Sequence, residues 1–151
     1  MGDFVAYWIS HQDKFLAALG EHLVIVGVVL VWSLVVAALI TLAIRRSRRV
    51  ENAVLQVLGA LYSVPSLALF SLLIPLTGLG LTSATIVMVA YNQFLLVRNI
   101  VEGLNGVDSG VVEAATGMGM SPMQVLLRVE LPLAFPVIMA GVRLAVISTI
   151  G

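Results

Sequence analysis

A few polar side chains interrupt the apolar runs of this sequence, and these are the residues that could carry chemistry. Asn92 and Gln93 are adjacent within the run from 84 to 101, and Arg143 interrupts the last run. Helical neighbours lie about 100° apart, so we expect one amide to line a path or a subunit contact and the other to bond a neighbouring helix. Arg143 has no acidic partner in any apolar run, so we expect it to pair with backbone carbonyls, with either amide, with another chain or with water. Interhelical hydrogen bonding is an equal alternative for all three.

Other candidates surround a break in the run from 54 to 76. Pro65, within the sequence SVPS, removes a backbone donor, so we expect a kinked, broken or re-entrant helix whose free carbonyls Arg143 could meet. Two tyrosines could converge on a path here. Two rings do not form the aromatic cage that holds a quaternary ammonium ion, and core packing is the alternative. The path candidates at the break are Tyr62, Ser63, Pro65, Ser66 and Tyr91.

The sequence contains no pattern of catalytic residues. It has no cysteine and no Gly-x4-Gly-Lys-Ser/Thr loop, and its two histidines, His11 and His22, lie near one end. We therefore expect no enzyme activity, no metal site and no cofactor in this chain.

The composition is that of a membrane protein. Of the 151 residues, 60% are hydrophobic and 11% are charged, with a mean hydropathy of +1.10. Soluble domains are about 45–50% apolar and about 25% charged. We predict an all-α membrane protein: an interfacial amphipathic segment at 1–21, then a transmembrane domain at 22–151. Its spans are predicted at about 22–44, 54–76, 84–101 and 132–151.

Basic residues indicate the orientation in the membrane. The cluster RRSRR at 45–49 follows the first span, and Arg98 and Arg128 fall on the same side. Excess arginine marks the cytoplasmic side of a membrane protein. We expect the N-terminus outside and the polar loop at 102–131 in the cytoplasm.

The first half of this loop is predicted to be a short helix. Asp108 precedes an Ala-rich stretch, as helix caps do, and Glu113 should lie in the first turn, where a negative charge favours the helix dipole. Gly117 and Gly119 are suited to its C-terminal end. We expect a glycine elbow to follow.

A second short helix is predicted to begin after the elbow. Ser121 and Gln124 have the spacing of a capping box, with proline at the first helical position between them. The methionines of the elbow offer a soft apolar surface to a moving partner. An ordered connector with no partner is the alternative.

The loop resembles the EAA loop of permease subunits in binding-protein-dependent ABC importers. The family pattern is Glu-Ala-Ala, three residues, Gly, nine residues, then Ile-x-Leu-Pro, and only Val129 departs from it here. The resemblance implies that this loop is the coupling helix that seats in a groove of the cytoplasmic ATPase. The residues to which it gives that role are Glu113, Ala114, Ala115, Gly119, Ser121, Leu131 and Pro132.

The resemblance covers nearly everything after about residue 50. Stretches such as VPSLALFSLLIPLTGLGL and LVRNIVEGLNGVD are similar to the osmoprotectant branch, which imports glycine betaine, carnitine and choline. This implies a type I ABC importer permease-like helical bundle in the cytoplasmic (inner) membrane, forming the translocation path and working by alternating access. Family members usually continue beyond STIG at 148–151, so we expect the C-terminal part to be missing.

The same resemblance implies the partners. ATP and Mg are expected in a cytoplasmic ABC ATPase subunit, substrate selection in an extracytoplasmic solute-binding protein, and a second permease subunit, identical or paralogous, beside this one. Two other functions stay open: a permease for methionine or another small solute, and a non-transporting membrane scaffold or regulator that docks an ATPase.

Overall fold

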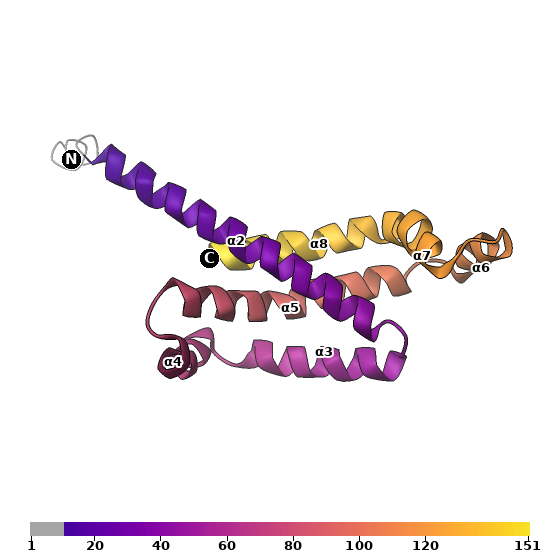
Figure 1. The fold of residues 1–151 in the computed structure, drawn as a ribbon, viewed down its shortest axis with the longest axis horizontal. Coiled ribbons are helices and arrows are strands. Elements are labelled where there is room, and N and C mark those ends of the chain that lie inside the picture. Colours follow the sequence, from indigo (N-terminus) through magenta and orange to yellow (C-terminus); the bar gives the residue numbers. More distant parts are fainter. Residues whose placement is uncertain (1–10) are drawn as a thin grey trace.

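The computed structural model describes residues 11–151, and every regular element in this range is a helix, as predicted (Figure 1). Residues 1–10 of the predicted interfacial segment lie outside the described residues. The elements are α2 (Gln12–Ile44), α3 (Arg48–Ser63), α4 (Ser66–Thr77), α5 (Leu81–Asn105), α6 (Ser109–Gly117), α7 (Pro122–Val125), a π-helical turn (Leu126–Glu130) and α8 (Leu131–Ile150).

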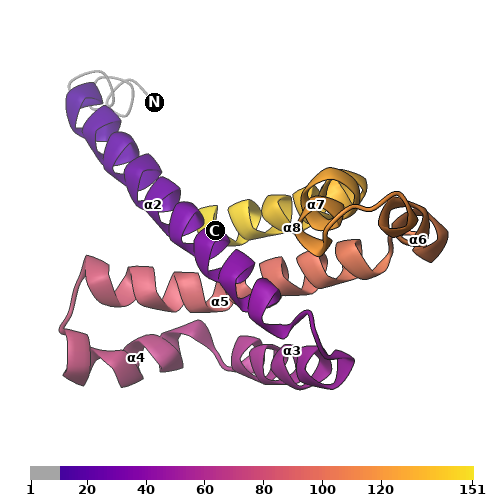
Figure 2. The ribbon, with the colours of Figure 1, turned by 45° about the vertical axis from the view of Figure 1, so that its right-hand side comes forward.

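Helix α5 is the centre of the bundle. Helices α2, α3, α4 and α8 all pack on it, with α2 crossing it obliquely and α3 running beside it (Figures 1 and 2). Leu96 and Val97 of α5 are fully buried against two small residues, Ala37 of α2 and Ala145 of α8. Small residues at these crossings let helices approach closely, which is how helices associate in a membrane.

The number of apolar helices agrees with about four membrane segments. Three are long and apolar enough to span a membrane: α2, α5 and the continuous helical stretch Pro122–Ile150. Helices α3 and α4 form a bent pair with 93° between them, which is either a broken span or a re-entrant loop. The break lies where Pro65 predicts it, because the residue before a proline is driven out of the helical region and Val64 is extended here.

Helix α2 differs from the prediction. It begins at Gln12 and continues without interruption to Ile44, so no helix break separates residues 12–21 from the first predicted span. Its 33 residues extend about 50 Å at about 1.5 Å per residue, and its N-terminal half projects from the bundle (Figure 2). The Leu- and Ala-rich sequence around Gly20 favours helix strongly enough to carry the chain through the polar positions.

Helix boundaries differ at the polar loop as well. Helix α5 continues to Asn105, past the predicted span end, and the fourth span is not preceded by a separate loop segment. Helix α7 passes through the π turn directly into α8. Pro132 has no N–H to donate and would crowd the carbonyl four residues earlier, and a wider π turn lies directly before it.

Candidate functional site

Helix α6 projects from one end of the bundle, where it contacts only α7 and the π turn closely (Figure 1). Its N-terminus is capped as predicted: the Asp108 carboxylate accepts hydrogen bonds from the backbone N–H of Gly110 at 2.7 Å and of Val111 at 3.4 Å. Glu113 lies in the second turn, not the first as predicted, because the helix begins at Ser109. Asp108 therefore provides the negative charge at the N-terminus, and the exposed Glu113 is free for a partner.

The glycine elbow and the second cap have the predicted conformations. Helix α6 ends at Gly117, and Gly119 has a φ of 86°, in the left-handed region that favours glycine. Ser121 and Gln124 form the capping box: the Ser121 N–H donates to Gln124 Oε1 at 2.8 Å, and the Gln124 N–H donates to Ser121 Oγ at 3.4 Å. These bonds fix how α6 and α7 meet.

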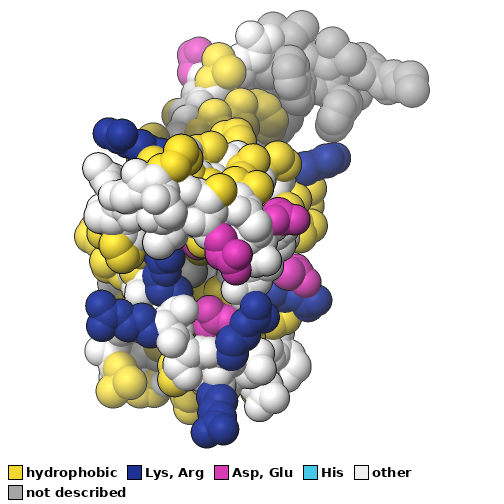
Figure 3. All heavy atoms as spheres, turned by 90° about the vertical axis from the view of Figure 1, so that its right-hand side faces the viewer, with side chains coloured by type: hydrophobic (Ala, Val, Ile, Leu, Met, Phe, Trp, Pro, Cys, Tyr) yellow, Lys and Arg dark blue, Asp and Glu magenta, His cyan; other side chains and the backbone are white. Residues whose placement is uncertain are grey.

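The loop presents apolar side chains outward. Met118 is 78% exposed and Met123 58% exposed, whereas Ala115 is buried and holds α6 against its neighbours. Figure 3 looks onto this end and shows basic and acidic side chains around it, with hydrophobic ones among them. An exposed apolar surface on a short, capped hairpin is suited to docking. Of the other loop residues singled out in the sequence, Ala114 and Pro132 are exposed and Leu131 is half-buried.

An ion pair that the sequence analysis missed ties this end together. Arg45 Nη2 donates to Glu130 Oε2 at 2.9 Å and so joins the end of α2 to the π turn. Beside it, the buried Glu51 of α3 accepts a hydrogen bond from Asn105 Nδ2 of α5 at 3.2 Å. Glu130 falls inside the Glu113–Pro132 pattern, and its charge close to Arg128 in an otherwise apolar stretch was the available signal.

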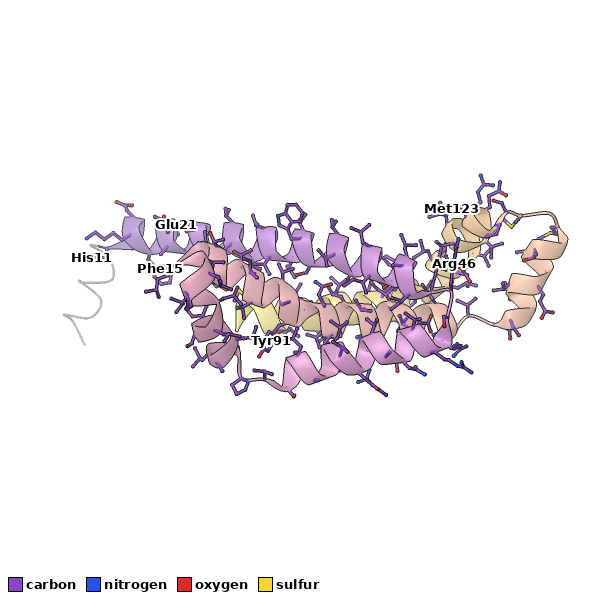
Figure 4. The ribbon with its side chains drawn as sticks, turned by 60° about the horizontal axis from the view of Figure 1, so that its bottom comes forward. His11, Phe15, Glu21, Arg46, Tyr91 and Met123 are labelled. Carbon is purple, nitrogen blue, oxygen red and sulfur yellow. The ribbon has the colours of Figure 1, made fainter. Side chains whose placement is uncertain are left out.

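A cavity of about 470 Å³ lies at the α3–α4 break and is called the break pocket. Most of the predicted path candidates meet there, and Figure 4 shows Tyr91 on the side of α5 that faces α3. Gln93 and Arg143 do not line it. Its walls include Tyr62, Ser63, Pro65, Ser66, Tyr91 and Asn92, together with Ser148 and Thr149 of α8.

Asn92 joins three helices at the inner wall of the break pocket. Its Nδ2 donates to Thr149 Oγ1 of α8 at 2.9 Å and lies 3.2 Å from Ser33 Oγ of α2. All three residues are buried. The sequence analysis missed Ser33, a lone hydroxyl in an apolar stretch, and Thr149, which follows Ser148 in another. Asn92 thus both lines the pocket and bonds neighbouring helices.

Gln93 lies among the packed helices. Its Nε2 donates to the Val89 carbonyl at 2.8 Å and to the Ser33 carbonyl at 3.3 Å. Its Oε1 is buried without a hydrogen-bond partner in the described part of the chain. We expected one amide to line a path and the other to bond a neighbouring helix. Gln93 bonds a neighbouring helix, whereas Asn92 bonds neighbouring helices and also lines the break pocket.

Tyr91, rather than Arg143, reaches the carbonyl freed by the break. The Tyr91 hydroxyl donates to the Val64 carbonyl, and the Tyr91 ring packs 5.6 Å from that of Tyr62. Arg143 is exposed on α8, and within residues 11–151 it forms no salt bridge. The expected meeting of Arg143 with the break does not occur, because a nearer donor occupies it.

A second cavity, of about 620 Å³, lies between the first half of α3 and the second half of α5 and is called the arginine pocket. The sequence analysis did not predict it, because its residues come from α3 and α5, and the packing of these two helices has no local signal in the sequence. Arg98 stands over the Phe94 ring, with 5.8 Å from its guanidinium carbon to the ring centroid, and is only 3.9 Å from Glu102. The pocket walls include Arg48, Asn52, Gln56, Phe94, Arg98 and Glu102.

The break pocket offers hydroxyl and amide groups, and the arginine pocket adds charged side chains. Amides, hydroxyls and guanidinium groups can hold and release a small polar solute, and Tyr62, Tyr91 and Phe94 offer aromatic faces to a cation. Together with the projecting hairpin, the arrangement is suited to solute passage driven by a partner.

Comparison with known proteins agrees with this arrangement. The family model "Binding-protein-dependent transport system inner membrane component" matches residues 30–151. The chain is 32% identical to the glycine betaine/carnitine/choline transport system permease protein OpuCB of Bacillus subtilis, covering 100% of this chain and 70% of the relative. It is 33% identical to the choline transport system permease protein OpuBB of the same organism, with 100% and 70% covered. It is 41% identical over 97 residues to the ergothioneine transport permease/ergothioneine binding protein EgtU of Helicobacter pylori, with 64% and 18% covered.

Proposed function

The chain belongs to the family of binding-protein-dependent transport system inner membrane components, and from that premise we propose that it forms the translocation path of an ATP-driven importer for trimethylammonium solutes. The observation that carries the proposal is the projecting hairpin from Glu113 to Pro132. It combines a capped helix, a left-handed glycine and exposed methionines in the sequence pattern of a coupling loop. No chemistry in this chain is needed, because coupling is mechanical.

The solute class follows from what the relatives are named for. Glycine betaine, carnitine, choline and ergothioneine all carry a trimethylammonium group. Aromatic faces attract such cations, and the break pocket has Tyr62 and Tyr91 on its wall beside Asn92. Three polar or aromatic groups without a closed cage support weak binding, which favours release during transport. Selection among these solutes belongs to an extracytoplasmic binding protein.

The partners and the orientation complete the proposal. The hairpin seats in a cytoplasmic ABC ATPase subunit, where ATP and Mg bind, and Glu113, Ala114, Gly119 and Met118 contact it. A second permease subunit covers the polar faces that cannot face lipid, Arg143 among them. The arginines at the α2–α3 turn support an orientation with that end in the cytoplasm and the N-terminal end of α2 outside.

Uptake into proteoliposomes tests the proposal. The complete permease is assembled with its ATPase and binding protein, and uptake of labelled glycine betaine is measured with and without ATP. We expect ATP-dependent uptake that unlabelled choline or carnitine reduces and that methionine does not. Competition by methionine alone would assign the chain to another solute, and uptake that persists without this subunit would make it a scaffold.

A further inference from the structure

The break pocket and the arginine pocket are consecutive along one line where α3 and α5 pack, here called the α3–α5 seam. Gln56, Gly59 and Tyr62 follow each other at intervals of three residues on α3, and Tyr91, Phe94 and Arg98 do so at three and four on α5. Residues at these spacings share one helix face. Tyr62 and Tyr91 line the break pocket, and Gln56 and Arg98 line the arginine pocket. Gly59 and Phe94 lie between.

The Phe94 ring is held at this midpoint by three contacts. Its centroid lies 5.1 Å from that of Tyr62, and the Arg98 guanidinium covers one face. The third contact is with Gly59: a Cβ on this residue would lie 3.2 Å from Phe94 Cε2. Only glycine therefore lets the ring approach the α3 backbone this closely.

The seam is the polar side of the two helices. Between the arginines at its cytoplasmic end and the break pocket, the α3 side of the seam carries the amides Asn52 and Gln56, which are unfavourable in lipid. Polar groups at membrane depth face protein or water. A seam of this kind is suited to line a water-filled passage, and an apolar ring across such a passage excludes water and polar solutes.

We propose that Phe94, seated against Gly59 and Tyr62, is the barrier that separates the break pocket from the arginine pocket in the closed permease. The ring closes the seam by filling it. Arg98 positions the ring through its cation–π contact. While the ring is seated against Gly59, the two pockets are closed to each other. Opening requires the Phe94 ring to move away from Gly59. This inference rests on the proposed function only in that the seam belongs to the solute path.

The chain offers a clean experiment, because it contains no cysteine. Ser66→Cys introduces a single thiol in the break pocket, and Gln56→Cys introduces one in the arginine pocket. Each is placed in the assembled complex in intact cells, without ATP-driven turnover, and labelled from outside with a membrane-impermeant maleimide. In the otherwise unchanged protein we expect Ser66→Cys to be labelled and Gln56→Cys to be protected.

Removing the ring should open the passage. With Phe94→Ala added, we expect Gln56→Cys to be labelled from outside at least about tenfold faster. Phe135→Ala, which removes an exposed ring from α8, serves as the matched control and should leave Gln56→Cys protected. Phe94→Val is the second variant for the case that Phe94→Ala does not assemble, since it also removes the ring but leaves a larger apolar side chain in the bundle.

Two results would overturn the barrier. One is equal protection of Gln56→Cys with and without the Phe94 ring, in the alanine or the valine variant. The other is rapid labelling of Gln56→Cys in the protein that retains both residues. Labelling needs no cargo, so the barrier and the solute assignment fail separately: unchanged accessibility refutes the first, and absent betaine uptake refutes the second.

Discussion

Arg45 and Glu130 form an ion pair of 2.9 Å between the end of α2 and the π turn that connects the projecting hairpin to α8. Helix α2 is the longest helix in the described range, and the hairpin is the part of the chain that projects farthest at this end (Figure 1). The pair is therefore a direct mechanical link between the hairpin and a helix that crosses the membrane.

Reversing one charge of this pair should weaken coupling. Arg45→Glu places two carboxylates together, whereas the double variant Arg45→Glu/Glu130→Arg restores attraction. The side chains are 31% and 16% exposed, so solvent screens part of the interaction, and its loss is worth about 1–2 kcal/mol. We expect solute imported per ATP hydrolysed to fall about fivefold to tenfold in the single variant and to recover in the double one.

Arg46→Glu is the matched control, because Arg46 is exposed next in sequence and forms no salt bridge among residues 11–151. It should leave coupling within about twofold. If Arg46→Glu and Arg45→Glu reduced coupling equally, the general positive charge of this end would be responsible and the pair would not.

Gly119 should be intolerant of a side chain. Its φ of 86° lies in the left-handed region, where an ordinary residue costs about 1–2 kcal/mol and a β-branched one more. Gly119→Val is expected to change the backbone direction at the elbow and so the orientation of α6 relative to α7. The ATPase should then fail to co-purify and uptake should be abolished, while membrane insertion stays intact. Gly117→Val tests the specificity, because Gly117 also has open space around it but an ordinary backbone conformation. Normal ATPase capture by Gly119→Val would disprove a coupling role for the elbow.

Much of the hairpin and the break could be predicted because their signals are local. Asp108, Ser121 with Gln124, Gly119 and Pro65 each act on backbone groups within a few residues, so their types and spacing determine the conformation there. Glu113 was expected in the first turn and lies in the second, because the helix begins at Ser109, directly after the Asp108 cap.

Contacts between distant helices could not be predicted in the same way. Asn92 meets Ser33 and Thr149 across more than fifty residues of sequence, and nothing near Ser33 indicates which helix it faces. Arg143 was expected at the break for want of another partner, but the position of Tyr91 depends on how α3 and α5 pack. Tertiary packing, which has no local signature, decides both.

Asn92 should contribute to stability as well as to the pocket. Asn92→Leu removes the amide that donates hydrogen bonds to the Ser33 and Thr149 hydroxyls. Interhelical hydrogen bonds in membranes are worth about 0.6–2 kcal/mol each. We expect the melting temperature of the purified complex in detergent to fall by about 2–6 °C.

Ser148→Ala is the comparison for Asn92, because Ser148 lines the same pocket but is exposed. It should leave the melting temperature unchanged. A contribution of Asn92 to solute binding would appear separately, as a higher KM for uptake by the assembled Asn92→Leu complex. An unaltered melting temperature for Asn92→Leu would refute the network as a stabilising contact.

Close packing of α8 on α5 should make Gly141 irreplaceable. A Cβ at this position would lie 2.5 Å from the Asn99 Cβ, an atom fixed to the α5 backbone, so the two helices would have to separate. Overpacking of this kind costs about 1–3 kcal/mol. We expect Gly141→Ala to lower the melting temperature by several degrees and to reduce the yield of assembled complex. Gly27 lies on the open side of α2, where an added Cβ would meet no heavy atom of another element within 4 Å. Gly27→Ala should therefore leave both unchanged. Equal behaviour of the two variants would mean that α8 does not approach α5 this closely in the membrane.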